Sequence, residues 1–114
     1  MLPKSHRLSS PAVQTVLRSG ARLRSQLLSC RFVEEKKGSE AFAAVVPLRV
    51  AKGAVARNKA RRALYRVLGE LPLPPVRAVL MLEKLPTGDD ELRQDIGLLF
   101  GKMEASLQQK KHHV

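Results

Sequence analysis

The sequence predicts a single α/β domain built around one small sheet, and three observations lead to this fold class. The chain has 114 residues, of which 44% are hydrophobic, so it can build one modest core. Some apolar segments alternate with a period of two, whereas others repeat at helical spacing. In chain order these segments give α-β-β-α-β-α, in which a strand, a helix and a further strand imply a crossover within one sheet. Residues 1–114 show no internal repeat and are assigned to one domain.

The first helix is predicted within SSPAVQTVLRSG, residues 9–20. Ser10 can cap it, Pro11 suits a first turn that needs no N–H donor, and Gly20 can end it. Its narrow apolar face comprises Val13, Val16 and Leu17.

Two strands joined by the turn KKGSE are predicted next. In RSQLLSCRFVEE, residues 24–35, alternation places Leu28, Cys30 and Phe32 on one face of the strand. The returning strand lies in AFAAVVPLRV, residues 41–50. Pro47 is expected to end its pairing or to split it, because proline has no N–H for the ladder.

A strongly basic helix is predicted over residues 54–68, AVARNKARRALYRVL, and GELPLPP ends it. At about 100° per residue, its apolar face comprises Ala56, Ala60, Ala63, Leu64, Val67 and Leu68. The rest of its surface carries Arg57, Asn58, Lys59, Arg61, Arg62, Tyr65 and Arg66.

The last strand and the last helix complete the pattern. VRAVLMLEKL, residues 76–85, is a near-continuous apolar run that fits a strand buried on both faces. The final helix is predicted over residues 89–108, with Asp89 or Asp90 as its cap. Its apolar stripe comprises Leu92, Ile96, Leu99, Met103 and Leu107. Residues 110–114 are expected to form a frayed tail.

The charge of the chain indicates a polyanionic partner. Its net charge is +11 and its isoelectric point is about 10.7. The first 69 residues hold 15 of the 21 Lys and Arg residues, and no acid occurs between Glu40 and Glu70. The basic helix therefore lacks the ion pairs that usually stabilise a charged helix. Most of its cations are arginines, whose planar guanidinium suits phosphate oxygens. A surface that binds nucleic acid is the favoured interpretation.

Other classes of protein fit the composition less well. The single cysteine, Cys30, allows no intramolecular disulfide and favours a reducing, cytoplasmic location. No apolar run approaches the roughly 18 residues of a membrane span, and the N-terminus lacks an apolar secretory signal. An organelle transit peptide is the weaker alternative. A membrane-surface helix would need large apolar residues, whereas the apolar face of residues 54–68 is mostly alanine.

The basic helix resembles the signature helix of the bacterial ribonuclease P protein subunit, Arg-Asn-Arg-x-Lys-Arg-x-x-Arg. Arg57 and Asn58 match outright, and Lys59 stands for the third arginine. Arg61 and Arg62 occupy the next two basic positions. Tyr65 replaces the last arginine of the signature, with Arg66 beside it. The resemblance extends over nearly the whole chain, from Arg7 and Leu8 in the lead-in to the closing helix.

The resemblance implies a two-layer α/β sandwich with an unusual left-handed β-α-β crossover, as in the ribosomal S5 domain 2-like fold. It implies a monomeric protein bound one-to-one to a catalytic RNA, which removes the 5′ leader of precursor tRNA through Mg²⁺ held mainly by the RNA. No catalytic or metal-binding side chain is then expected in the protein. The alternative left open is a general RNA-binding protein without a processing role.

The resemblance also implies two groups of binding residues. Contacts to RNA are expected from Arg57, Asn58, Lys59, Arg61, Arg62, Tyr65 and Arg66, with Arg49 and Lys52 as neighbours. A cleft for the leader is expected at Val13, Leu17, Leu28 and Cys30, where the family usually carries aromatic residues at three of the positions. Stacking on a base is worth about 1–3 kcal/mol, so the missing aromatics imply weaker leader binding.

Overall fold

The computed structural model describes residues 2–111 and contains one four-stranded sheet. The strands are β1 (Ala21–Arg24), β2 (Leu28–Glu34), β3 (Ala41–Val45) and β4 (Val76–Leu82). Their order across the sheet is β1-β2-β4-β3. β3 and β4 are parallel, whereas the other neighbours are antiparallel. The predicted mixed α/β fold with one sheet is confirmed.

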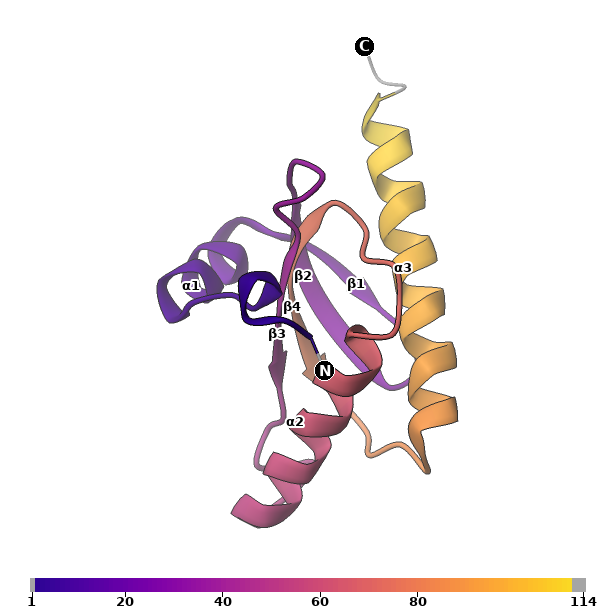
Figure 1. The fold of residues 1–114 in the computed structure, drawn as a ribbon. Helices are drawn as coiled ribbons and strands as arrows, with labels where there is room; N and C mark the ends of the chain where they lie inside the picture. The colour runs from indigo at the N-terminus through magenta and orange to yellow at the C-terminus, as the bar shows by residue number, and fades with distance from the viewer. Residues whose placement is uncertain (1, 112–114) are drawn as a thin grey trace.

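Three α-helices pack on this sheet from two sides (Figure 1). They are α1 (Ser10–Ser19), α2 (Ala54–Leu68) and α3 (Asp89–Lys111), and a short 3₁₀ turn, η1 (Lys4–His6), precedes them. α2 and α3 cover one face of the sheet, and α1 covers part of the other. α2 links the neighbouring parallel strands β3 and β4, so the predicted crossover is present. The left-handed sense of this crossover was implied by the family resemblance, and it stays a prediction.

The main core lies between the sheet and the pair α2 and α3. Alternate residues of β2 and β4 enter it, as period-two strands require. Phe42 of β3 meets Phe100 of α3 with ring centroids 5.4 Å apart. The predicted apolar stripe of α3 is confirmed, because all five of its residues are buried. Leu64 and Leu68 of α2 are also fully buried.

A smaller apolar cluster holds α1 against the opposite face of the sheet. Val16 is 1% exposed and packs with Ala43 of β3 and Val79 of β4. Gly20 ends α1 where the chain passes close to β2. A Cβ atom at Gly20 would lie 2.6 Å from the carbonyl oxygen of Val16 and 2.9 Å from the amide nitrogen of Phe32. Only glycine therefore fits this crossing.

The N-terminal segment lies along β3 and closes the end of the main core. Leu2 is 2% exposed, and its N–H donates to the carbonyl oxygen of Tyr65 over 3.1 Å. The Leu8 N–H donates to the carbonyl oxygen of Phe42 over 3.0 Å. Arg7 also forms a parallel bridge with Phe42. This segment is part of the fold.

The sequence prediction missed β1 and misplaced two helix boundaries. β1 is short and mostly exposed, so it has no apolar alternation of its own. Ser9, rather than Ser10, caps α1, because its Oγ accepts from the Ala12 N–H over 3.4 Å. β3 ends at Val45, so the expectation that its pairing would end at Pro47 is confirmed. α3 continues to Lys111, so residues 110 and 111 are helical, and the rest of the predicted tail lies outside the described residues.

A buried carboxylate of α3 fixes the turn between β1 and β2. Asp95 is 4% exposed. Its Oδ2 accepts from the Ser25 hydroxyl over 2.6 Å and from the Leu27 N–H over 3.1 Å, and its Oδ1 accepts from the Gln26 N–H over 3.1 Å. The Lys102 ammonium donates to the carbonyl oxygen of Arg24 over 2.7 Å. α3 therefore holds β1 through polar contacts at both its turn and its last residue.

Candidate nucleic-acid interface

The first half of α2 projects beyond the sheet (Figure 1). Ala56, predicted on the apolar face, is exposed because no other element covers this part of the helix. The cations here are also exposed: Lys52, Lys59, Arg61 and Arg62. Within residues 2–111, none of these four cations forms an ion pair with an acidic side chain. Their charge is therefore available to an external anion.

Two further signature residues are partly buried and organise this end of α2. The Arg57 guanidinium donates through Nη1 to the carbonyl oxygens of Ala51, over 3.1 Å, and Lys52, over 2.7 Å. It therefore ties the preceding loop to the helix. The Asn58 Oδ1 accepts a hydrogen bond from the Arg61 guanidinium, which orients that arginine on the exposed surface.

Tyr65 is partly buried and turns toward β3 rather than standing free on the exposed basic surface, and its predicted contact with RNA stays a prediction. Its hydroxyl oxygen accepts from the Ala44 N–H of β3 over 3.1 Å. The Arg7 guanidinium lies over the ring, 4.9 Å from the centroid, a cation–π geometry. The ring also packs against the main core. Tyr65 joins α2 to β3 and to the N-terminal segment.

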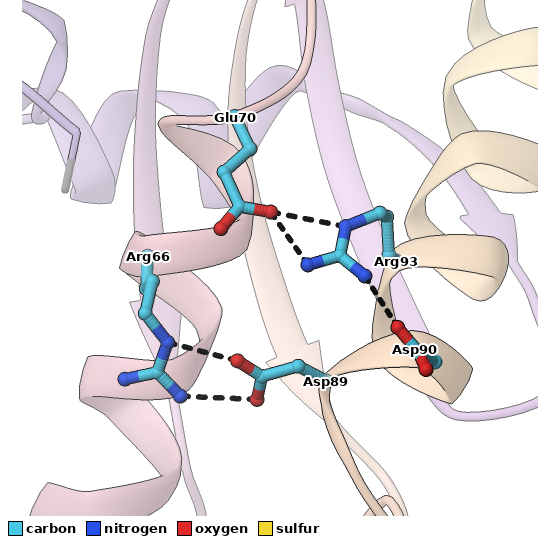
Figure 2. Close-up of polar contacts among 5 residues, drawn as sticks. All are labelled: Arg66, Glu70, Asp89, Asp90 and Arg93. Carbon is cyan, nitrogen blue, oxygen red and sulfur yellow. Dashed lines mark hydrogen bonds and ion pairs between the residues drawn. The ribbon is translucent and has the colours of Figure 1, made fainter.

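Arg66 forms part of an ion-pair network between α2 and α3 (Figure 2). Its Nε and Nη2 donate to the two carboxylate oxygens of Asp89 over 2.8 and 3.0 Å. Arg93 of α3 donates to Glu70 over 2.7 and 3.0 Å and to Asp90 over 2.7 Å. The hydrogen bond from Arg66 and its positive charge hold the pKa of Asp89 below its usual range. Arg66 is thus paired with α3, unlike the projecting cations.

A second basic feature lies beside α1. An open hollow of about 540 Å³ separates the end of α1 from β1, β2 and β4. It is lined by Leu17, Arg22, Leu23, Arg24, Ser29, Cys30, Arg31, Val79, Met81 and Glu83. Three arginines and one acid give its lining a positive balance, and the partly exposed Leu17 and Met81 provide apolar surface. No aromatic side chain is among the described residues that line it.

Hydrogen bonds order the polar groups of this hollow. The Arg31 guanidinium donates to the carbonyl oxygen of Leu17 over 2.9 Å, near the end of α1. The Glu83 Oε2 accepts from the Ser29 hydroxyl over 2.7 Å, and its Oε1 accepts from the Arg49 Nη2 over 2.9 Å. The Ser29 hydrogen bond, followed by the contact with Arg49, holds the pKa of Glu83 below its usual range. Arg49 is not among the lining residues, but through Glu83 it contacts the edge of this hollow.

Only some of the predicted cleft residues lie at this hollow. Leu17 lines it, and Val13 packs in the small cluster under α1. The placement of Leu28 in a cleft is wrong, because Leu28 is fully buried in the main core on the opposite face. Cys30 borders the hollow, but it is 4% exposed and also belongs to the main core. Burial raises the pKa of its thiol to about 11.

Sequence reasoning missed the residues that do line the strand side of the hollow. Ser29 and Arg31 alternate with Leu28 and Cys30 along β2 and so face the other way. The sequence does indicate these two residues, because a polar residue between buried apolar residues of a strand is expected on the less covered face of the sheet. Arg22 and Arg24 come from β1, the strand that the sequence did not predict.

The described residues offer no metal site in the protein. Within residues 2–111, no group of three or more His, Cys, Asp or Glu residues is placed to hold an ion. None of the helices in this range has the length and apolar character needed to cross a membrane.

The projecting cations of α2 and the arginine-lined hollow define a small α/β protein that binds nucleic acid. The family model of Ribonuclease P matches residues 2–104. The chain therefore belongs to the ribonuclease P protein family, and it acts with an RNA partner in ribonuclease P, which processes tRNA. No curated protein matches the sequence.

Solved structures agree with this fold. The RNase P protein from Thermotoga maritima superposes with a TM-score of 0.70 at 17% identity, over 84% of this chain and 96% of that chain. The RNase P protein of Staphylococcus aureus gives a TM-score of 0.67 at 14% identity, over 89% of this chain and 96% of that chain. At these identities, both matches show that this chain has the same fold as the two solved proteins. No comparison favours a general RNA-binding protein without a processing role.

Proposed function

We propose that this chain binds the catalytic RNA of ribonuclease P through the projecting end of α2 and binds the 5′ leader of precursor tRNA in the hollow beside α1. This proposal rests on the observation that, among the described residues, acidic side chains do not balance the cations at these two places. Four exposed cations on and before α2 lack acidic partners within residues 2–111, and three arginines face one acid in the hollow.

The projecting end of α2 suits the phosphates of a folded RNA. Arg61 and Arg62 present planar guanidinium groups that can bond two phosphate oxygens each. Lys52 and Lys59 add flexible point charges to the same end. Arg57 holds this surface in place, because its guanidinium donates hydrogen bonds to the loop before the helix.

The hollow suits a single RNA strand. Arg22, Arg24 and Arg31 supply positive charge, and the partly exposed Leu17 and Met81 supply a surface for bases. Because none of the described residues that line the hollow is aromatic, charge replaces stacking as the main source of affinity. Leader binding by this chain should therefore depend steeply on salt.

The chemistry of leader removal is assigned to the RNA. The described residues contain no cluster that fits a metal ion, so we place the Mg²⁺ of the reaction on RNA groups and derive no step through the protein. The protein then contributes binding and orientation of the substrate. A one-to-one complex of a monomeric protein with the RNA, in the cytoplasm, completes the proposal.

Reconstitution with the ribonuclease P RNA of the same source tests this function. Cleavage of precursor tRNA is measured with and without protein at near-physiological Mg²⁺ and salt. Stimulation that grows with leader length supports the proposal. Binding to RNA without any stimulation of cleavage refutes it and favours the general RNA-binding alternative.

A double substitution locates the surface for the catalytic RNA. Arg61→Ala with Arg62→Ala should lower the slope of log affinity against log salt by about 1.5, because each lost phosphate contact contributes roughly 0.7–0.9. Lys36→Ala with Lys37→Ala removes the same charge from the exposed β2–β3 turn and serves as the matched control. Equal slopes for both double variants would place the RNA surface elsewhere.

A further inference from the structure

One acidic side chain lies in the hollow that otherwise carries only positive charge. Among the described residues that line it, Glu83 is the sole acid, and its side chain is 19% exposed. A carboxylate at this place repels phosphate, so it weakens the simplest use of a basic hollow. Its presence calls for a ligand group that donates hydrogen bonds.

The Glu83 carboxylate is held in place before any ligand binds. Its own N–H donates to the carbonyl oxygen of Leu27 over 2.7 Å, which fixes the backbone just after β4. Ser29 and Arg49 each donate to one carboxylate oxygen, over 2.7 and 2.9 Å. A carboxylate has about four lone-pair sites, so these two contacts leave acceptor capacity on both oxygens.

The surroundings of this carboxylate fit the edge of a nucleobase. Met81, which is partly exposed, supplies apolar surface in the same hollow, where a base can lie. Arg49 sits beside Glu83 and carries further N–H donors on its guanidinium. A donor group and an acceptor group therefore stand side by side. Guanine presents the complementary edge, because its N1–H and N2–H groups donate and its O6 accepts.

We propose that Glu83, with Arg49, selects guanine at one position of the bound leader and disfavours uracil there. This inference rests on the proposed binding of the leader in the hollow. Uracil offers a single N–H between two carbonyl oxygens, and those oxygens would face the carboxylate. Cytosine and adenine each offer one amino group beside a ring nitrogen that accepts, so they match less well than guanine.

The test uses the reconstituted holoenzyme and precursor tRNAs whose leaders are all uracil except for one scanned guanine. We expect one leader position at which guanine lowers the substrate dissociation constant by roughly tenfold, the scale of one specific base contact. Glu83→Gln should reduce this preference to about twofold or less, because the amide keeps one acceptor and presents a donor in place of the other. Glu35→Gln, which alters an Arg–Glu pair with Arg77 outside the hollow, should keep the full preference.

The possible outcomes separate this inference from the proposed function. Stimulation that depends on leader length, but with equal affinity for all scanned leaders, overturns the role of Glu83 and leaves leader binding intact. A Glu83→Gln enzyme that binds every leader less tightly by the same factor shows that Glu83 only orients Arg49, and also overturns the inference. Stimulation that does not depend on the leader at all refutes both proposals.

Discussion

Replacing Asp95 by alanine tests whether a carboxylate of α3 holds the β1–β2 turn and, through it, the strand that carries Arg22 and Arg24. Asp95 is 4% exposed and accepts three hydrogen bonds, from the Ser25 hydroxyl and from the N–H groups of Gln26 and Leu27. Alanine removes all three acceptors at once. Asparagine keeps one acceptor oxygen in nearly the same volume.

The burial of these three hydrogen bonds determines how much unfolding free energy Asp95→Ala should lose. The contact to the Leu27 N–H is buried, whereas those to Ser25 and Gln26 are partly buried and can regain water. A buried donor left without an acceptor costs about 1–3 kcal/mol, and a hydrogen bond to a charged group contributes about 1.5–3 kcal/mol. Partial rescue by water brings the expected loss for Asp95→Ala to about 3–4 kcal/mol of unfolding free energy. Asp95→Asn should lose about 1–2 kcal/mol.

Urea unfolding followed by circular dichroism measures this loss. With an m value of about 1.5 kcal/mol per M, the midpoint for Asp95→Ala should fall by roughly 2 to 2.7 M. Asp90→Ala is the matched control, since Asp90 lies in the first turn of the same helix and its side chain is fully exposed. Its effect should stay within about 0.5 kcal/mol. A loss below about 1 kcal/mol for Asp95→Ala would refute the anchoring role.

Two further predictions concern pKa values. Burial raises the pKa of the Cys30 thiol to about 11. Iodoacetamide at pH 8 should therefore alkylate Cys30 only as urea unfolds the protein. Rapid alkylation of the folded protein would contradict the place of Cys30 in the core. Arg66 lowers the pKa of Asp89, so the pair stabilises the fold above the unfolded-state pKa of Asp89 and loses this effect as the pH falls through the folded-state pKa. Asp89→Asn should therefore lower the melting temperature at neutral pH and have little effect in strong acid, and an equal effect at both would be inconsistent with this pair.

Local periodicity predicted the helices well. The basic helix has the bounds that its sequence predicted, residues 54–68, because breakers flank a clear helical repeat. The apolar stripe of α3 was predicted in full for the same reason, since every third or fourth residue must meet the same core. The charge pattern also separated the basic first part of the chain from its nearly neutral end.

The faces of the strands were harder to predict. Alternation along β2 correctly grouped Leu28, Cys30 and Phe32. It does not say which side of the sheet meets the larger core, and a shift of one residue exchanges the two faces. The resemblance placed Leu28 and Cys30 at the cleft, but Leu28 is fully buried in the main core, and Ser29 and Arg31 line the hollow together with Cys30.

The sequence by itself determined the helical elements, the order of the predicted segments and the excess of positive charge, because these depend on residues close together in the chain. Only the tertiary structure decided which cations pair with acidic side chains of the protein and which do not. Arg66 meets Asp89 from another helix, and Tyr65 meets Ala44 from a strand. β1 likewise exists through its pairing with β2 and its contacts with α3. Such partners lie far apart in sequence, so packing alone brings them together.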